Sequence, residues 1–208
     1  MPNERDTGRT RNPRGEGGRL REEILAAAAG LLNETGDSRA VTLRAVARSV
    51  GIAAPSIYRH FDGQPAMMLA VVEQDFAALE QSLRAAVDAA GAEPRAQLVA
   101  GCQAYLTFAV EHPGSYRAMF GGEWIPELDE TITEDRLRSL GDGSMAVIRE
   151  ALGRCVQDGT SSSDSPADDA VALWLGLHGI AHQRASTRIF IGPDGIEDRM
   201  IGALAHLV

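Results

Sequence analysis

Apolar side chains recur every three or four positions along most of the chain, a spacing that predicts α-helices. The clearest example lies between residues 42 and 50, where one helix face would carry Leu43, Val46, Ala47 and Val50. Thr42 precedes this stripe and can cap the helix, and Gly51 can end it in a left-handed conformation. A second short helix is expected directly afterwards, with Pro55 in its first turn and Ile57 and Phe61 facing inward. Two short helices joined by a turn with glycine predict a helix-turn-helix, whose second helix enters the DNA major groove.

The same periodicity predicts helices on both sides of this motif. They are expected at 19–35, 65–90, 95–111, 133–156 and 169–188, with a short one around Tyr116 to Phe120 and a last one from Ile196 to Leu207. The glycines in Gly141-Asp142-Gly143 should bend or break the helix at 133–156. Residues 1–18 are rich in Arg, Gly and Pro without an apolar period, so we expect a disordered basic tail. That tail is either a solvated segment or an arm that contacts DNA.

Charge is distributed unevenly along the 208 residues. The net charge is −9, and every one of the 20 basic residues is arginine. Residues 1–62 hold ten arginines against eight acids, whereas the rest holds ten arginines against twenty-one acids. An acidic body is repelled by DNA, so any DNA contact is expected from the arginines of the first third.

The residues of the motif resemble those of tetracycline-repressor (TetR) family transcriptional regulators. The resemblance rests on Thr42-Leu43, Ala47, Gly51, Ser56-Ile57-Tyr58 and His60-Phe61. It implies an all-α fold, with a three-helix helix-turn-helix domain at 19–65 and a helical ligand-binding and dimerisation domain at 66–208. Trp174, His178 and Gly179 are also similar to the Trp-His-Gly signature of one C-terminal domain type in that family.

The resemblance and the motif together give a set of expected DNA-contacting residues. These are Thr42, Arg44, Ala54, Pro55, Ser56, Tyr58, Arg59, His60 and Gln64. Tyr58 and His60 are expected on phosphates, and Ser56 and Arg59 near base edges. Gln64 stands where the family often has a lysine, so its phosphate contact would be neutral and weaker.

Aromatic, sulfur and polar side chains on the later helices suggest a mostly apolar effector pocket. The candidate residues are Tyr105, Phe108, Met119, Phe120, Trp124, Trp174 and His178. The alternative is that these side chains are ordinary core. The helix at 169–188 is apolar on nearly all sides, so a second copy of the chain is expected to cover one face. Together with the stripe Ile196, Met200, Leu204 and Leu207, it predicts a homodimer through the last two helices.

The sequence favours a regulator over an enzyme. It contains no GxSxG or Walker motif, so we expect no catalytic residue and no cofactor. His178 and His182 have metal-chelating spacing but no identifiable third ligand, and a buried histidine is the alternative. Cys102 and Cys155 are isolated, and no segment has the length of a signal or membrane span, so a cytoplasmic protein is expected. The predicted function is a repressor released from a palindromic DNA operator by a small molecule. The alternative is a helical binding protein or enzyme whose helix-turn-helix is only structural.

Overall fold

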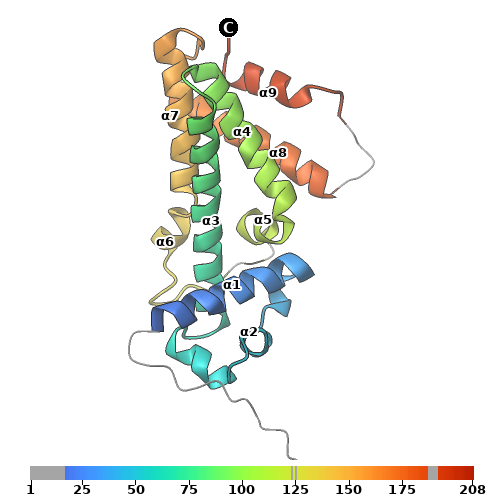
Figure 1. The fold of residues 1–208 in the computed structure, drawn as a ribbon. Helices are drawn as coiled ribbons and strands as arrows, with labels where there is room; N and C mark the ends of the chain where they lie inside the picture. The colour runs from blue at the N-terminus through green and yellow to red at the C-terminus, as the bar shows by residue number, and fades with distance from the viewer. Residues whose placement is uncertain (1–16, 123, 125, 187–191) are drawn as a thin grey trace, which may run out of the picture.

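The computed structural model describes residues 17–122, 124, 126–186 and 192–208, and in these ranges the chain is helical with no β-strand (Figure 1). The elements are α1 (Gly17–Thr35), η1 (Ser38–Ala40), α2 (Leu43–Val50), η2 (Ala54–Arg59), α3 (Gln64–Ala89), α4 (Pro94–Glu111), α5 (Pro113–Phe120), α6 (Glu134–Arg138), α7 (Asp142–Asp158), α8 (Pro166–Ser186) and α9 (Ile196–Leu204). The two η elements are 3₁₀ helices. The predicted all-α fold is confirmed. The tail predicted at 1–18 lies outside the described residues, except for its last two, which begin α1.

Helix α3 is the central rod of the molecule and belongs to both hydrophobic clusters. Its first half packs with α1 and α2 through Met68, Val72 and Phe76. Its second half packs with α4 and α7 and contributes Leu79 and Leu83 to the cluster of the body. In Figure 1 the rod runs from the α1–α2 end of the molecule up between α4 and α7. Since α3 contributes to both clusters, the domain boundary predicted at residue 65 stays a prediction.

The helix predicted at 133–156 is broken, as its glycines suggested. Gly141 has φ of +86°, a left-handed conformation that favours glycine, and it separates α6 from α7. A Cβ at this position would lie 2.9 Å from the Phe76 ring, so the turn also packs too closely on α3 for a side chain. Both effects together explain why α6 ends early and α7 begins at Asp142.

The two C-terminal helices cover one side of the body, with α8 behind α4 and α9 next to α8 (Figure 1). Helix α8 buries Leu173 and Leu177 but leaves Val171 and Leu175 exposed, at 47% and 64%. The α9 stripe behaves differently from the prediction. Met200, Leu204 and Leu207 pack against the chain's own core, and Ile196 is the stripe residue that is 38% exposed. The apolar surface left open therefore lies mainly on α8.

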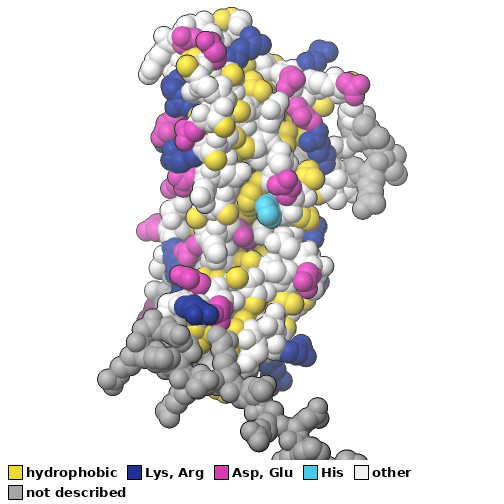
Figure 2. All heavy atoms as spheres, viewed as in Figure 1, with side chains coloured by type: hydrophobic (Ala, Val, Ile, Leu, Met, Phe, Trp, Pro, Cys, Tyr) yellow, Lys and Arg dark blue, Asp and Glu magenta, His cyan; other side chains and the backbone are white. Residues whose placement is uncertain are grey.

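The surface of the body carries acidic and arginine side chains interspersed along its length (Figure 2). Several ion pairs form between residues of the same helix, as in Arg84–Glu80 and Arg138–Glu134. No described helix is long and apolar enough to cross a membrane.

Candidate DNA-binding and effector sites

The first helix of the motif forms as the sequence predicts. The Thr42 hydroxyl accepts a hydrogen bond from the Ala45 amide at 3.2 Å and so caps α2. Gly51 adopts φ of +73° and its N–H bonds to the Arg48 carbonyl, which ends the helix. Val46 is fully buried, so one face of α2 is fixed against the core. The opposite face, with Arg44, is exposed.

The second helix of the motif differs from the prediction, because residues 54–59 form a 3₁₀ helix. Its bonds run from the Ser56 amide to the Ala53 carbonyl and from the His60 amide to the Ile57 carbonyl. At six residues, Ala54–Arg59 is longer than most 3₁₀ helices, and Pro55 lies in its first turn. Ile57 and Phe61 are buried as predicted, at 0% and 5% exposed.

The inward residues of the motif determine which side chains remain outside. Tyr58 is 60% exposed, and Arg59 is also exposed, whereas Ser56 and His60 are half-buried. In a 3₁₀ helix, side chains three positions apart lie above one another, so Ser56 and Arg59 share one side. Residues 42–61 contain three arginines and no acid, which makes this surface locally positive. The other residues of the motif predicted to contact DNA are Ala54, which is half-buried, and Thr42 and Pro55, which are exposed.

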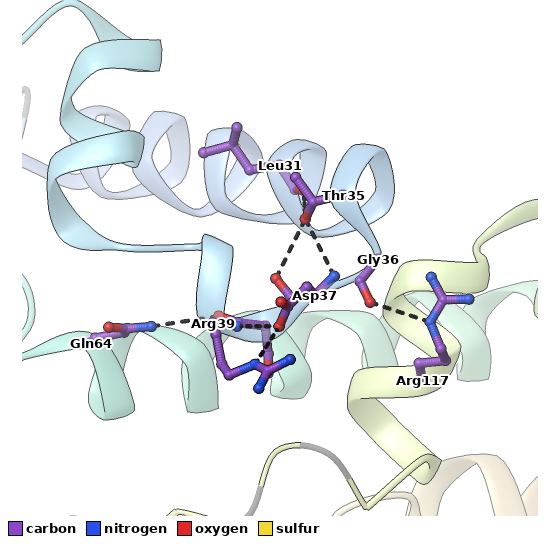
Figure 3. A network of polar contacts seen from close by, with 8 residues as sticks. Leu31, Thr35, Gly36, Asp37, Arg39, Gln64 and Arg117 are labelled. Atoms are coloured by element: carbon purple, nitrogen blue, oxygen red, sulfur yellow. Dashed lines mark hydrogen bonds and ion pairs between the residues drawn. The ribbon is translucent and has the colours of Figure 1, made fainter.

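Gln64 and the end of α1 are held by a network of polar contacts (Figure 3). The Gln64 amide donates to the Ser38 carbonyl at 3.5 Å, so it is directed toward η1. The Asp37 carboxylate accepts from both the Arg39 amide and its guanidinium, which keeps the pKa of Asp37 below its ordinary value. These bonds fix the turn that connects α1 to α2. They also give Gln64 a structural partner inside the protein.

The residues predicted to line a pocket do not all lie together. Tyr105, Phe120, Trp174 and His178 form one aromatic cluster, with ring centroids 4.4–6.4 Å apart. Phe108 packs instead on His112, at 4.8 Å between ring centroids. Trp124 packs on the cluster around α1 and α2, and Met119 borders both clusters. Sequence reasoning missed Tyr116, which is 4% exposed and lies 5.1 Å from the Phe120 ring.

Hydrogen bonds indicate which ring nitrogen of His178, in this cluster, carries a hydrogen. Its Nδ1 lies 3.0 Å from the Trp174 carbonyl oxygen and 3.1 Å from the Tyr105 hydroxyl. A carbonyl can only accept, so Nδ1 carries the hydrogen and the Tyr105 oxygen shares it. The Tyr105 hydroxyl then donates to that of Tyr116 at 3.4 Å. Burial lowers the pKa of His178, so the ring is neutral at pH 7 and the cluster holds no charge of its own.

The other candidates for chemistry have structural roles. Among the described residues, no group of three His, Cys, Asp or Glu side chains could hold a metal ion, and His182 is exposed with Nε2 near the Ser186 hydroxyl. Cys102 and Cys155 are buried free thiols, and burial raises the pKa of Cys102 to about 12. Such thiols are poor nucleophiles.

A surface groove of about 260 Å³ lies between α3 and the α6–α7 turn, across the Glu73–Arg136 ion pair.

Comparison with known proteins decides the family. Residues 24–71 match the family described as bacterial regulatory proteins, tetR family, and residues 98–204 match the tetracyclin repressor-like C-terminal domain. The chain belongs to the TetR family. The C-terminal match includes Trp174, His178 and Gly179. The chain is therefore a DNA-binding transcriptional regulator.

Relatives share part of the sequence of this chain, and solved structures share its fold. Nucleoid occlusion factor SlmA of Photobacterium profundum is 29% identical over 137 residues, 64% of this chain and 66% of the relative. SlmA of Idiomarina loihiensis is 30% identical over 139 residues, 64% of this chain and 68% of the relative. The matches thus span about two thirds of those relatives. A protein of unknown function from Rhodococcus sp. RHA1 superposes with a TM-score of 0.74 at 25% identity, covering 94% of this chain and 95% of that one. The TetR family transcriptional regulator PfmR of Thermus thermophilus gives a TM-score of 0.61 at 19% identity, with 87% and 94% covered.

Proposed function

We propose that this TetR-family chain is a repressor that binds a palindromic operator as a homodimer and is released by a small molecule. The observation that carries the proposal is the motif itself. Tyr58 and Arg59 extend from a firmly anchored, acid-free segment, while the rest of the chain is acidic. An arginine in the major groove can read guanine O6 and N7 together, and a tyrosine hydroxyl suits a phosphate.

The DNA-contacting surface is Thr42, Arg44, Ala54, Pro55, Ser56, Tyr58, Arg59 and His60. We place Gln64 outside it, because its amide already bonds to the Ser38 carbonyl. We expect no catalytic activity and a cytoplasmic location. Should the helix-turn-helix be only structural, the chain would show no preference for any DNA.

A DNA titration tests this function. Fluorescence anisotropy on the DNA upstream of the chain's own gene, against random DNA of equal length, should show preferential binding. Arg59→Ala should lose most of that preference, since one bidentate base contact is worth about 1–3 kcal/mol. Arg149→Ala is the matched control, because it removes an exposed arginine from α7, far from the motif along the chain. Equal losses for both variants, or equal binding to both DNAs by the wild type, would contradict the proposal.

The proposed dimer uses the exposed apolar face of α8. Val171 and Leu175 are open to solvent there, and Ile196 adds to the surface from α9. Pairing α8 and α9 with their symmetry mates would make a four-helix interface. A two-fold dimer presents two reading heads about 34–36 Å apart, or a multiple of this distance, which favours a palindromic operator.

The proposed effector site is the aromatic cluster around His178. In support of this, Phe120 and His178 are only half-buried, and the cluster combines apolar rings with a few hydroxyl and imidazole groups. A ligand that favours a conformer with wrongly spaced heads would release the DNA. A thermal-shift screen against metabolites should find a compound whose stabilisation is lost in His178→Ala. His182→Ala, which changes an exposed histidine four residues on, should retain it. A hit that is unaffected by His178→Ala would place the effector elsewhere.

A further inference from the structure

Where α1, α3 and α5 meet, one half-buried carboxylate has a buried oxygen without a hydrogen-bond partner. Asp75 lies on α3, and its Oδ2 atom is buried with no hydrogen-bond partner. Such atoms are rare in proteins, because an unpaired buried polar group costs about 1–3 kcal/mol and more when charged. The mechanism proposed above assigns Asp75 no role, so its position calls for an explanation.

The helices around Asp75 join the DNA-binding part of the chain to the body. The Asn33 side chain of α1 donates to the Ser115 hydroxyl at 3.3 Å and accepts from the Ser115 amide at 3.1 Å. Gly114 lets the two backbones touch, since a Cβ there would lie 2.7 Å from the Asn33 Cα. The Arg117 guanidinium donates to the Gly36 carbonyl at 3.3 Å and holds the end of α1 against α5 (Figure 3).

Asp75 is connected to this contact through Ser115. The Ser115 side chain, which is 1% exposed, accepts from Asn33 and is also close enough to the Asp75 carboxyl to lower its pKa. A line of polar groups thus runs from α1 through α5 to α3. Asp75 therefore lies next to a group that holds α1 against α5.

We propose that Asp75 is a proton-sensitive latch between the DNA-binding domain and the body. The α1–α5 contact is tightest when the Asp75 carboxyl is neutral, and loosens when the carboxylate is charged. In the docked arrangement the charged form has one buried oxygen without a hydrogen-bond partner. Movement of α1 away from α5 would admit water to it.

The electrostatic surroundings give the latch its pH range. Desolvation raises the pKa of Asp75 from 3.8 to about 6, against smaller lowering effects of the Ser115 hydrogen bond and of His112. From α1 the nearest member of the network, Asn33, is neutral, and from α5 the Arg117 guanidinium is directed to Gly36. His112, at the junction of α4 and α5, is the titratable neighbour whose field reaches Asp75 among the described residues.

The sign of the effect follows from linkage. A carboxyl with a raised pKa in the docked state binds its proton more tightly there than in water. Docking is therefore most favourable at low pH and is weakened as the pH rises through about 6. Because the pKa of the carboxyl rises from 3.8 to about 6 on docking, the docking equilibrium constant should fall about tenfold between pH 5 and pH 7. His112 acts in the opposite direction, because its protonated form favours the charged carboxylate.

Hydrogen exchange of the intact chain without DNA tests the latch. After correction for the intrinsic rate, amides in residues 29–36 and 113–117 of the wild type should open up to about tenfold more readily at pH 7 than at pH 5. Amides of residues 98–106 in α4 are the internal reference, and their opening should not change with pH in this way. Asp75→Asn should remove the pH effect from both junction segments, whereas Asp88→Asn, an exposed carboxylate on the same helix, should retain it. His112→Gln should retain it as well.

Three results would overturn the proposal. The wild-type junction could show no pH effect beyond that of residues 98–106. The Asp88→Asn variant could lose the effect as completely as Asp75→Asn, or His112→Gln could abolish it. The wild-type series needs no substitution, so a misfolded variant leaves the test intact. Because no operator is used, a chain that bound no DNA would refute the proposed function without deciding this experiment.

Discussion

The exposed face of α8 gives the most direct test of how the chain reads DNA. Leu175 is 64% exposed in the single chain, and fully burying a leucine contributes about 1.5–3 kcal/mol. Covering the exposed two thirds in a dimer would contribute about 1–2 kcal/mol per copy, and two-fold symmetry doubles this to about 2–4 kcal/mol. Leu175→Glu loses that contribution and places a carboxylate in an apolar interface. The dimer dissociation constant should therefore rise at least about a hundredfold.

Val110 provides a control of matched chemistry, because it is also 64% exposed but lies on α4. Sedimentation velocity and an operator titration on the same samples would compare Val110→Glu with Leu175→Glu. We expect the control to be dimeric with wild-type operator affinity, and Leu175→Glu to be a folded monomer that binds operator poorly. A Leu175→Glu chain that remains dimeric, or a monomer with full affinity, would refute the reasoning.

Three further substitutions test the motif, the helix junction and the core. Tyr58→Phe removes a hydroxyl placed for a phosphate contact. In an anisotropy titration it should weaken binding to operator and to random DNA by the same factor, and a loss confined to the operator would argue for base reading. Gly114→Ala forces a Cβ against the α1 backbone and should lower the unfolding free energy in urea by about 1–3 kcal/mol, unless α1 can shift without cost. Trp174→Ala leaves a cavity beside Tyr105 and should cost about 3–5 kcal/mol by the same measurement, whereas a loss below about 1 kcal/mol would remove Trp174 from the core.

Local rules of helix formation could be read from the sequence because each acts within a few residues. The Thr42 cap, the left-handed Gly51 and the buried pair Ile57 and Phe61 are all present. The 3₁₀ winding of residues 54–59 was not predicted, because Phe61 lies two residues beyond this helix and its burial beside Ile57 does not report how residues 54–59 are wound. Apolar periodicity reports the face that is buried and says nothing about the exact winding.

Long-range pairing could not be read from the sequence. The bond between Asn33 and Ser115 joins residues that are 82 positions apart, and neither stands in a recognisable motif. For the same reason the stripe on α9 was assigned to a partner chain, although Leu204 packs within its own core. An amphipathic stripe shows that one helix face is buried, but whether the same chain or a partner packs on that face depends on tertiary structure. Asp75 was missed because a single acid on a long helix is ordinarily solvated.

The two connections between α1 and the body differ in what their opening would cost. α3 is one continuous helix of 26 residues, with its single proline at the second position and no glycine, so bending it would break helical hydrogen bonds. Its contacts with α1 are apolar and buried, through residues such as Met68. The α1–α5 contact combines apolar packing around Ala118 with a few side-chain hydrogen bonds, each worth about 0.5–1.5 kcal/mol, near one carboxylate oxygen without a partner. Under the proposed latch, α1 would move by opening its contact with α5 while α3 stays intact. Helix α5 is also part of the proposed effector site, because its residues Tyr116 and Phe120 belong to the aromatic cluster around His178.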